Sequence, residues 1–412
     1  MNEKLTLEYS IPEENKTDIT EQLGKADKAY ELLLGSKFGM TGWIDYPGEC
    51  HEELFTKISE MAENIRSRFS AVVVIGIGGS YLGAKAALDF MSSDEGHTTP
   101  KILFAGLNLD TDSYEKIFKE IEDEETAFII ISKSGQTTET IIAGNLFLKY
   151  IENKYGKDDI KERFFIVTDP DNGKLRKLAD EKGYQSLPIP PDVGGRYSVL
   201  TAVGLLPMAI AGFDIRRVIR GAESAMKDDL IGEAKRLAAV RNVFEKKGYT
   251  VELFASFDSC ISNVIHWIKQ LYGESEGKEG LGMIPVDMEY TKDLHSLGQF
   301  VQEGRQIFTE TVISVENRRN SIILSKEWGI SGRDMTLCEY NEIAEKGTIA
   351  AHKNAGIPIF QIRVPDRSEY SFGQMIYFFQ MSCAIRGVMM GVDPFNQPGV
   401  EKYKTEIKKN LK

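Results

Sequence analysis

Two short stretches of this chain of 412 residues carry residue types suited to holding a small anion. The first, VVVIGIGGSYLGAK at 72–85, is an apolar strand that leads into Gly78, Gly79 and Ser80. Glycine lets a backbone approach an anion closely, and a serine hydroxyl at a helix start can donate a hydrogen bond to it. The dinucleotide fingerprint G-x-G-x-x-G fails here, because Tyr81 stands where its last glycine is required. The lysine of a P-loop is also absent, so the stretch favours neither a nicotinamide dinucleotide nor a nucleoside triphosphate.

The second stretch, ISKSGQTTET, places five hydroxyl side chains within nine residues, again between a strand and a helix. They are Ser132, Ser134, Thr137, Thr138 and Thr140. Serine and threonine are preferred at a helix N-cap, but capping requires one or two such side chains rather than five. Two loops of this kind at the carboxyl ends of strands in one sheet predict a single small phosphorylated ligand.

Further residues are candidates for proton transfer and charge stabilisation. Glu274 follows an apolar helix and enters the glycine-rich loop GESEGKEG, in which Glu276 and Glu279 are equal candidates on composition. Spacing alone favours a solvated carboxylate for all three. The other candidates are Arg196 after two glycines, His295 in DLHSLGQ and Lys404 in the C-terminal tail. Taken singly, these are typical of a surface arginine, a hydrogen-bonded histidine and a surface lysine.

Six motifs, taken together and in order, resemble the phosphoglucose isomerase family, which has the sugar isomerase (SIS) fold. They are IGIGGSYLG, SKSGQTTET, GGRYSVLTAVGL, GESEGKEG, DLHSLGQ and PFNQPGVEKYK. The resemblance runs from about Gly42 to Lys404, and the length is similar to the shorter bacterial form. Two positions depart from the family pattern: Asn396 replaces the usual aspartate, and Leu107 stands where a polar residue is more common.

The resemblance implies an aldose–ketose isomerase that interconverts glucose 6-phosphate and fructose 6-phosphate in glycolysis and gluconeogenesis. It implies proton transfer through a cis-enediol(ate), with no metal and no cofactor. Glu274 is then the base, and Arg196 is the cation that stabilises the enediolate. His295 and Lys404 are implied in ring opening, with His295 completing the partner's active site in a homodimer. The implied substrate-binding residues are Gly78, Gly79, Ser80, Ser132, Lys133, Ser134, Thr137 and Gln397.

The elements that must position these residues alternate along the chain. In the first half the predicted strands are AVVVIGI, KILFAGL, AFIIIS and RFFIVTD, with helical patterns between them. In the second half they are YTVELFASF, GMIPVDM, SIILS and IPIFQIRV, with SCISNVIHWIKQLYG and SFGQMIYFFQMSCAIRGVMMG as helices. Strands that are apolar throughout and separated by helices are typical of parallel sheets covered on both faces.

We therefore expect an α/β protein with two doubly wound, flavodoxin-like domains, each a three-layer αβα arrangement around a mostly parallel sheet. The resemblance makes them SIS-type domains, followed by a C-terminal helical tail. The expected ranges are a lead-in at 1–45, a first domain at 46–218, a helical bridge at 219–247, a second domain at 248–392 and a tail at 393–412 that carries Gln397 and Lys404.

Composition narrows the class of protein. The net charge is −12 at pH 7, whereas a nucleic-acid-binding protein typically carries a basic surface. The same negative charge disfavours binding to an anionic membrane surface. The four cysteines form no C-x-x-C pair and the five histidines are scattered, so neither a disulfide framework nor a metal site is expected. The chain start lacks signal-peptide features, and the longest apolar run is too short to span a bilayer, which predicts a cytoplasmic protein.

Three other classes compete with this interpretation. A non-catalytic phosphosugar-binding SIS regulator usually adds a basic helix-turn-helix or a partner-facing surface, and it has no need for Glu274, Arg196, His295 and Lys404 together. An amidotransferase-linked sugar isomerase needs a glutaminase domain that begins with a cysteine, whereas SIS-like sequence is reached here by Val72. A nicotinamide-dependent dehydrogenase is disfavoured by the incomplete fingerprint. The regulator stays the alternative function.

Overall fold

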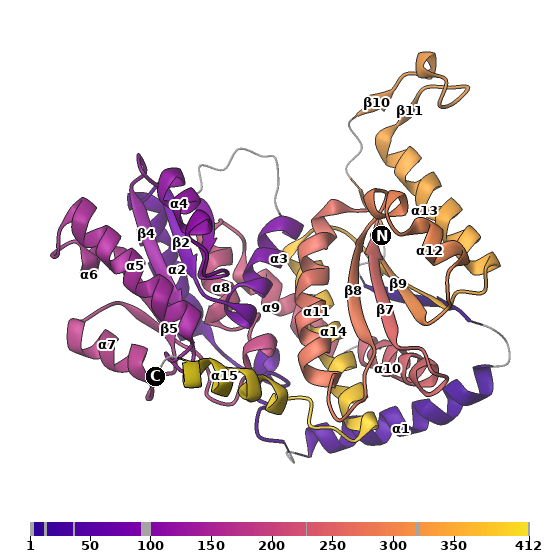
Figure 1. The fold of residues 1–412 in the computed structure, drawn as a ribbon, viewed down its shortest axis with the longest axis horizontal. Helices are drawn as coiled ribbons and strands as arrows, with labels where there is room; N and C mark the ends of the chain where they lie inside the picture. The colour runs from indigo at the N-terminus through magenta and orange to yellow at the C-terminus, as the bar shows by residue number, and fades with distance from the viewer. Residues whose placement is uncertain are drawn as a thin grey trace. The chain divides into compact units, whose positions relative to one another are not determined.

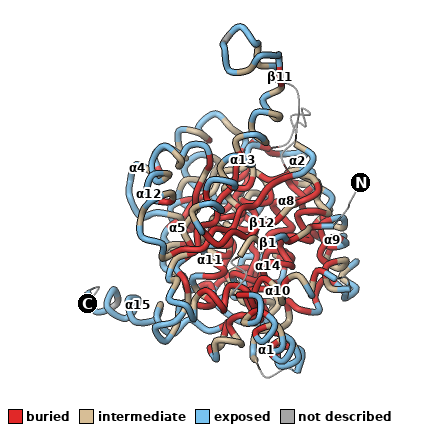
Figure 2. The backbone as a smooth tube through the Cα atoms, turned by 90° about the vertical axis from the view of Figure 1, so that its right-hand side faces the viewer, coloured by how far each residue is buried: buried red, intermediate tan, exposed pale blue. Residues whose placement is uncertain are grey.

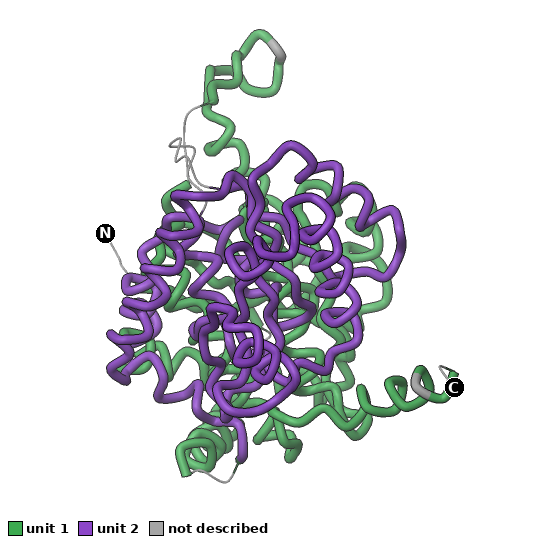
Figure 3. Tube along the Cα trace, turned by 90° about the vertical axis from the view of Figure 1, so that its left-hand side faces the viewer, with its two compact units in different colours: residues 1–38, 224–412 green, residues 39–223 purple. Residues whose placement is uncertain are grey.

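The structure, a computed structural model, describes residues 4–11, 15–35, 38–91, 100–227, 229–318 and 322–410. The chain forms two compact units: unit 1 is made of residues 1–38 and 224–412, and unit 2 of residues 39–223 (Figure 3). Each unit is built around a five-stranded sheet (Figure 1). Unit 1 is discontinuous, because it takes in the N-terminal segment as well as the second half of the chain.

Unit 2 has a fully parallel sheet. Its strands are β2 (Ala71–Ile75), β3 (Lys101–Ala105), β4 (Thr126–Ile131), β5 (Phe164–Thr168) and β6 (Ser186–Pro188). They pair in the order β3-β2-β4-β5-β6. Strands β2, β4 and β5 are buried at every position, which explains why these stretches are almost entirely apolar. After β2 the chain continues toward one edge of the sheet, and after β4 it continues toward the other. The place between the carboxyl ends of these two strands is a topological switch point, where ligands of doubly wound folds bind.

Helices cover both faces of the unit 2 sheet. On one face, α4 (Thr111–Glu120), α5 (Thr138–Tyr155) and α7 (Lys174–Lys182) pack on alternate strand residues such as Val73 and Phe128. The opposite face is covered by α2 (Glu52–Arg68), α3 (Leu82–Met91) and α8 (Ala202–Ile210) (Figure 1). The shorter segments are η2 (Tyr46–Gly48), η3 (Gly78–Ser80), α6 (Ile160–Arg163) and η4 (Gly195–Tyr197), and α9 (Ile215–Lys227) contains the boundary between the units.

Unit 1 repeats this strand order with one change. Its strands are β1 (Thr6–Ser10), β7 (Val251–Ser256), β8 (Ile284–Glu289), β9 (Phe308–Val315) and β12 (Ile359–Val364). Their order, β8-β7-β9-β12-β1, matches β3-β2-β4-β5-β6 of unit 2 position by position. The edge strand β1 is antiparallel to β12, with Thr6 opposite Arg363, whereas the other strands are parallel. The carboxyl ends of β7 and β9 are therefore the counterpart of the carboxyl ends of β2 and β4.

The helices of unit 1 also form two layers. One layer holds α10 (Leu230–Lys246), α11 (Ser262–Glu276) and α14 (Glu369–Met390), with α1 (Lys16–Leu34) packed on α10 and α14. The other holds α12 (Gly298–Glu303) and α13 (Leu337–Asn354). Helix α14 is mostly buried, whereas α15 (Pro398–Asn410) is exposed (Figure 2). The remaining turns are η5 (Ser259–Ile261), η6 (Lys292–His295) and η7 (Lys326–Trp328).

The predicted fold class, with two doubly wound αβα domains and a C-terminal helical tail, is confirmed. The central strand β9 escapes prediction, because Thr309, Glu310 and Thr311 interrupt its apolar pattern. All three are fully buried in the structure. Glu310 accepts hydrogen bonds from the Tyr290 hydroxyl, at 2.6 Å, and from His352, at 2.8 Å. Hydrogen-bond partners from other elements thus satisfy the buried carboxylate, and the strand cannot be recognised from its own sequence.

The strand predicted at 321–325 is confirmed in part, and it lies outside the main sheet. Only Ile323–Leu324 forms a strand, β10, and it pairs with β11 (Met335–Thr336) in a two-stranded hairpin. Ser321 lies outside the described residues. Apolar content misleads here because Ile323 is 70% exposed. Among the helices that the structure describes, none combines the length and apolar character needed to cross a bilayer.

Candidate functional site

The glycines after β2 allow two loops of unit 2 to touch. Gly78 opens η3 with φ of 58°, a backbone conformation that glycine adopts without strain. A Cβ atom on Gly79 would lie 2.1 Å from the carbonyl oxygen of Gly195 and 2.8 Å from the backbone nitrogen of Arg196. Only glycine therefore fits at position 79. This contact brings the turn that ends at Ser80 against the η4 turn that carries Arg196.

The hydroxyl loop after β4 is shaped by its own side chains. The Ser132 hydroxyl accepts a hydrogen bond from the backbone N–H of Gly135 at 3.2 Å, and the Ser134 hydroxyl accepts one from the N–H of Gln136 at 3.2 Å. Thr137 is the N-cap residue of α5, yet its side chain makes no capping hydrogen bond. Helix capping therefore does not account for this cluster of hydroxyls. The positive end of the α5 dipole adds to its suitability for an anion.

The Lys133 side chain is bound to a neighbouring segment of unit 2 and stabilises this loop. Its ammonium donates hydrogen bonds to the backbone carbonyls of Pro191, at 2.5 Å, and Val193, at 3.1 Å. Burial lowers the pKa of Lys133, although the carboxylates of Asp169 and Asp192 partly oppose that shift. In this arrangement the lysine joins the hydroxyl loop to the segment that leads into η4.

Arg196 is the fully buried cation among the residues of unit 2 that the structure describes. It is 1% exposed, and its guanidinium carbon lies 5.7 Å from the centre of the Tyr197 ring. That ring stacks in turn on Trp43, with 4.8 Å between the ring centres. Trp43 thus packs on η4 through the Tyr197 ring, and Gly79 packs against the same turn. One edge of unit 2 thus holds a guanidinium, glycine turns and hydroxyls, a combination suited to a phosphorylated ligand.

In unit 1, Glu274 lies in the last turn of α11 and is partly buried. Gln270, one turn earlier, donates a hydrogen bond from its amide nitrogen to the Glu274 carboxylate at 3.1 Å. Gln270 is not among the residues predicted from the sequence. Its signal was available, because residues at i and i+4 of a helix lie on the same face. The amide orients the carboxylate that we selected as the candidate base.

The structure separates three glutamates that composition left equal. Glu276 is 1% exposed and bound to the guanidinium groups of Arg241 and Arg386. Burial alone would raise the pKa of Glu276, but these two cations hold it below its usual value. Glu279 is exposed in the loop that follows. Glu274 is therefore the one carboxylate of the three that is neither fully buried in ion pairs nor fully exposed.

Glu274 lies near the amino end of strand β8 and His295 lies beyond its carboxyl end. Helix α11 connects the parallel strands β7 and β8, so it runs antiparallel to them and ends at their amino edge. His295 closes η6, just beyond the carboxyl end of β8. A helix of 15 residues spans about 22 Å, which sets the separation of the two residues on the order of 20 Å. Within one copy of unit 1, His295 does not reach Glu274.

The two C-terminal candidates differ in their surroundings. Gln397 is exposed just before α15, and the Lys404 ammonium pairs with Glu401 at 2.8 Å. The segment leading to them is tied to the loop after Glu274, because Lys278 donates a hydrogen bond to the carbonyl of Asp393. Unit 1 therefore brings this segment to the Glu274 end of α11.

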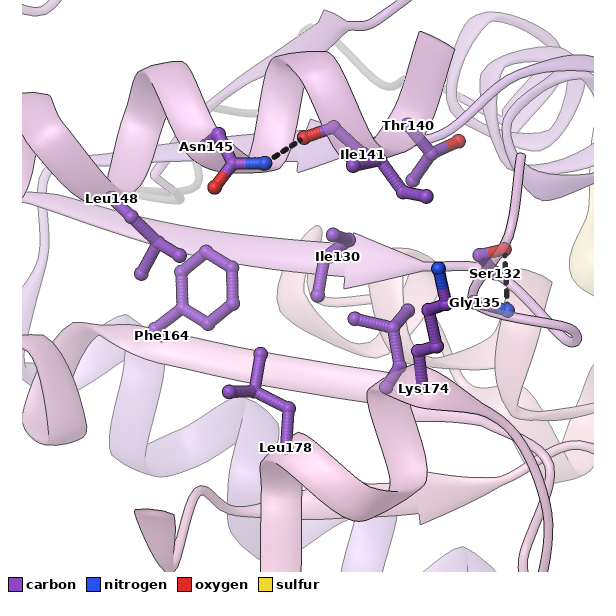
Figure 4. A pocket seen from close by; sticks show the side chains of 12 residues that line it. Ile130, Ser132, Gly135, Thr140, Ile141, Asn145, Leu148, Phe164, Lys174 and Leu178 are labelled. Atoms are coloured by element: carbon purple, nitrogen blue, oxygen red, sulfur yellow. Dashed lines mark hydrogen bonds between the residues drawn. The ribbon is translucent and has the colours of Figure 1, made fainter. Parts of the chain in front are cut away.

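A separate pocket lies beside the hydroxyl loop in unit 2. Its volume is about 180 Å³, and Figure 4 shows Ser132 at one end and Leu148 and Phe164 at the other. Ile130, Leu178 and their neighbours make most of its wall apolar. Aliphatic walls do not match a sugar phosphate, so the loops remain the better candidate for an anion than this pocket. In the part of the chain that the structure describes, no three His, Cys, Asp or Glu side chains are grouped to hold a metal ion.

This geometry is typical of a doubly wound α/β protein that binds an anion. In unit 2, the loops at the carboxyl ends of the strands suit an anion, and unit 1 carries a carboxylate that is a candidate base. Residues 55–307 match the family model described as phosphoglucose isomerase. A glucose-6-phosphate isomerase of Acetivibrio thermocellus is 40% identical over 98% of this chain and 95% of its own length. The chain therefore belongs to the phosphoglucose isomerase family.

Solved structures show the same fold. A protein of Thermus thermophilus described as hypothetical is 27% identical, with a TM-score of 0.88 over 98% of this chain and all of its own. A glucose-6-phosphate isomerase of Chlamydia trachomatis has a TM-score of 0.83 over 100% of this chain and 89% of its own, at 19% identity. The second match shows that the fold is shared.

Proposed function

We propose that this chain interconverts glucose 6-phosphate and fructose 6-phosphate as an aldose–ketose isomerase. The observation that carries the proposal is the contact between η3 and η4, which sets Arg196 beside the turn that ends at Ser80. In a family of isomerases, a buried guanidinium next to glycine and hydroxyl loops suits a phosphosugar whose reaction generates negative charge. The same proposal places the reaction in the cytoplasm, within glycolysis and gluconeogenesis.

The proposed chemistry needs a base, a cation and an anchor for the phosphate. Glu274 removes a proton from C2 of the open-chain aldose and returns it to C1 through a cis-enediol(ate), while Gln270 orients its carboxylate. Arg196 stabilises the oxyanion. The phosphate is bound by the loops after β2 and β4 and by the Gln397 side chain, with Lys133 bracing the hydroxyl loop. No metal and no cofactor take part.

The proposed active unit is a homodimer. The separation on the order of 20 Å between Glu274 and His295 within one copy supports it, because ring opening then needs the partner's histidine. The described hairpin β10–β11 also exposes Ile323 and Ile330 to solvent, at 70% and 53%, and a second copy would cover such residues favourably. Lys404 joins the histidine in ring opening.

Isomerisation of fructose 6-phosphate in deuterated water tests the function. With EDTA present, the wild type is expected to form glucose 6-phosphate with deuterium at C2, as followed by proton NMR. Glu274→Gln is expected to lose turnover by about 100-fold or more, because general base catalysis typically contributes that much. Glu279→Gln, an exposed carboxylate in the loop that follows α11, is the matched control and should keep turnover.

Other outcomes would redirect the proposal. Inhibition by EDTA would overturn the metal-free mechanism, and turnover that survives in Glu274→Gln would transfer the role of base to another carboxylate. Binding of a phosphosugar without any turnover would replace the isomerase by the SIS regulator, which the comparisons do not favour.

A mixing experiment tests the role of His295. Glu274→Gln and His295→Ala subunits, each inactive alone, are unfolded and refolded together. If the histidine acts across the interface, each mixed dimer regains one complete site, and random pairing restores about a quarter of wild-type activity. No recovery in mixed dimers would place both residues in one copy's site and overturn the shared site.

A further inference from the structure

One buried guanidinium holds both ends of the loop that follows Glu274. Arg386 of α14 is fully buried and donates hydrogen bonds to Glu276, which precedes loop 277–282, and to Glu245 of α10, at 2.6 Å. The other oxygen of the Glu245 carboxylate accepts the backbone N–H of Gly282, at 2.5 Å, where the loop ends. The start of the loop is thus bound to Arg386 directly, through Glu276. The end of the loop is bound to Arg386 indirectly, through Glu245.

A second arginine anchors the same turn to the sheet. Arg241 of α10 donates to both oxygens of Glu276, at 2.7 and 2.9 Å, and to Glu252 of β7, at 2.6 Å. Glu252 also accepts the hydroxyl of Thr311 in β9, at 2.8 Å. Arg241, Glu252 and Glu276 are each at most 1% exposed. The last turn of α11 is therefore joined to two helices and two strands through charged, fully buried contacts.

These contacts stabilise a turn that would otherwise be weak. Helix ends fray, and carboxylates at a helix C-terminus are unfavourable because they face the negative end of the helix dipole. Glu274 and Glu276 both lie in the last turn of α11. Two residues correspond to about 200° around a helix, so Glu276 points into the buried pairs while Glu274 is only partly buried. A turn fixed through Glu276 also fixes the direction of Glu274.

We infer that Arg386 is a positioning residue for the base Glu274: it holds loop 277–282 at both ends and so fixes the last turn of α11. The inference rests on the proposed function, since it concerns the same proton transfer. Arg386 does not touch the reacting atoms in this role. It acts through Glu276 and the loop, and a displacement of the base by about 1 Å is enough to cost about 100-fold in rate.

The test uses Arg386→Met and Arg386→Lys in the full-length protein, with matched changes at Arg318. Arg318 is a suitable control because it is also a largely buried arginine of unit 1 that bridges two carboxylates, Asp258 and Glu345. Those partners lie on the loop after β7 and on α13, away from loop 277–282. The measurements are thermal stability, kcat, KM and the isotope effect with glucose 6-phosphate deuterated at C2.

We expect Arg386→Met to lower kcat about 100-fold, with KM within about threefold of the wild type. The isotope effect should rise, because proton transfer to a misplaced base becomes rate-limiting. Arg386→Lys should recover part of kcat, since an ammonium can bind one of the two carboxylates. Arg318→Met and Arg318→Lys should lose thermal stability but keep the wild-type kcat and isotope effect of the folded fraction.

Equal behaviour of the Arg386 and Arg318 variants would overturn the inference and show a purely structural role. If Arg386→Met does not fold, Glu245→Gln provides the milder break at the Gly282 end, with a smaller loss of kcat and the same rise in isotope effect. An unchanged isotope effect there would also overturn it. A wild type without isomerase activity would instead contradict the proposed function, so the two failures are distinguishable.

Discussion

Two sheets with the same strand order carry opposite chemistry at their carboxyl edges. In unit 2, the loops after β2 and β4 present glycines and hydroxyls beside Arg196. In unit 1, the loops after β7 and β9 present Asp258 and Arg318 instead. The Asp258 carboxylate accepts hydrogen bonds from Arg318, at 2.6 and 2.8 Å, and from the backbone N–H of Val315, at 3.0 Å. A carboxylate of the protein itself thus lies where this topology would place an anionic ligand.

The difference shows that the fold decides where a ligand can bind and that the loop residues decide whether one does. Glycine at position 79 removes side-chain atoms from the unit 2 edge. At the unit 1 edge, Asp258, Arg318 and Glu345 fill the equivalent place with ion pairs. Unit 1 contributes its candidate base from the other end of α11, where Glu274 lies. The carboxyl ends of β2 and β4 are available for binding, whereas the same place at β7 and β9 is filled by ion pairs that contribute to stability.

The largest expected effect comes from closing the unit 2 edge with Gly79→Ala. The added Cβ would stand 2.1 Å from the carbonyl oxygen of Gly195, so the backbone must shift and separate Ser80 from Arg196. We expect kcat/KM to fall by more than about 100-fold, as a displacement of about 1 Å suffices for that loss. Gly195→Ala is the control for stability, because its Cβ would have no atom within 4 Å. Equal melting temperatures for the two variants would contradict the packing account.

The next effect comes from emptying the unit 1 edge with Asp258→Ala. This change leaves Arg318 with one carboxylate fewer and the Val315 N–H without its acceptor. Breaking a buried pair in this way should lower the free energy of unfolding by about 3 kcal/mol, as measured by urea denaturation. The folded enzyme should keep its kcat/KM. Glu316→Ala, an exposed change on the loop after β9 that also carries Arg318, should stay within about 0.5 kcal/mol of the wild type.

Two threonine N-caps sharpen the comparison further. Thr336 caps α13 in a capping box, in which its hydroxyl accepts the N–H of Glu339 at 3.1 Å, whereas Thr137 makes no such bond at α5. Thr137→Val should raise KM for fructose 6-phosphate about tenfold, because one hydrogen bond to a charged group is lost. Stability should change little. Thr336→Val should cost about 1 kcal/mol of unfolding free energy and leave KM unchanged. The reverse pattern would assign Thr137 to capping.

The smallest effect concerns acid stability at the Glu274 end of unit 1. Arg241 and Arg386 outweigh burial and hold the pKa of Glu276 below its ordinary value of 4.5. A lowered folded-state pKa stabilises the protein fully above that ordinary value, and the contribution is lost as the pH falls through the folded pKa. Glu276→Gln should therefore flatten the decline in unfolding free energy below pH 4.5, by at most about 1.4 kcal/mol per pH unit. An unaltered slope, with Glu279→Gln as control, would contradict the ion-pair account.

Much of the fold could be predicted from sequence, for a local reason. Strands buried on both faces are apolar almost throughout, so β2, β4 and β5 are visible in the residue pattern. The polar strand β9 is not, because Glu310 is satisfied by Tyr290 and His352 from distant parts of the chain. The N-terminal strand β1 joins β12 only through pairing across more than 300 residues, with Thr6 opposite Arg363.

The sequence by itself determined the family, the fold class and the candidate residues, because glycine turns, hydroxyl clusters and short motifs act through neighbours along the chain. The tertiary structure alone decided how those residues are used. It joined Lys133 to the carbonyls of Pro191 and Val193, and it buried Glu276 between two arginines while leaving Glu274 partly exposed. It also set Glu274 near the amino end of β8 and His295 beyond its carboxyl end. Such pairings depend on which helices and strands meet in space, and no local pattern encodes that.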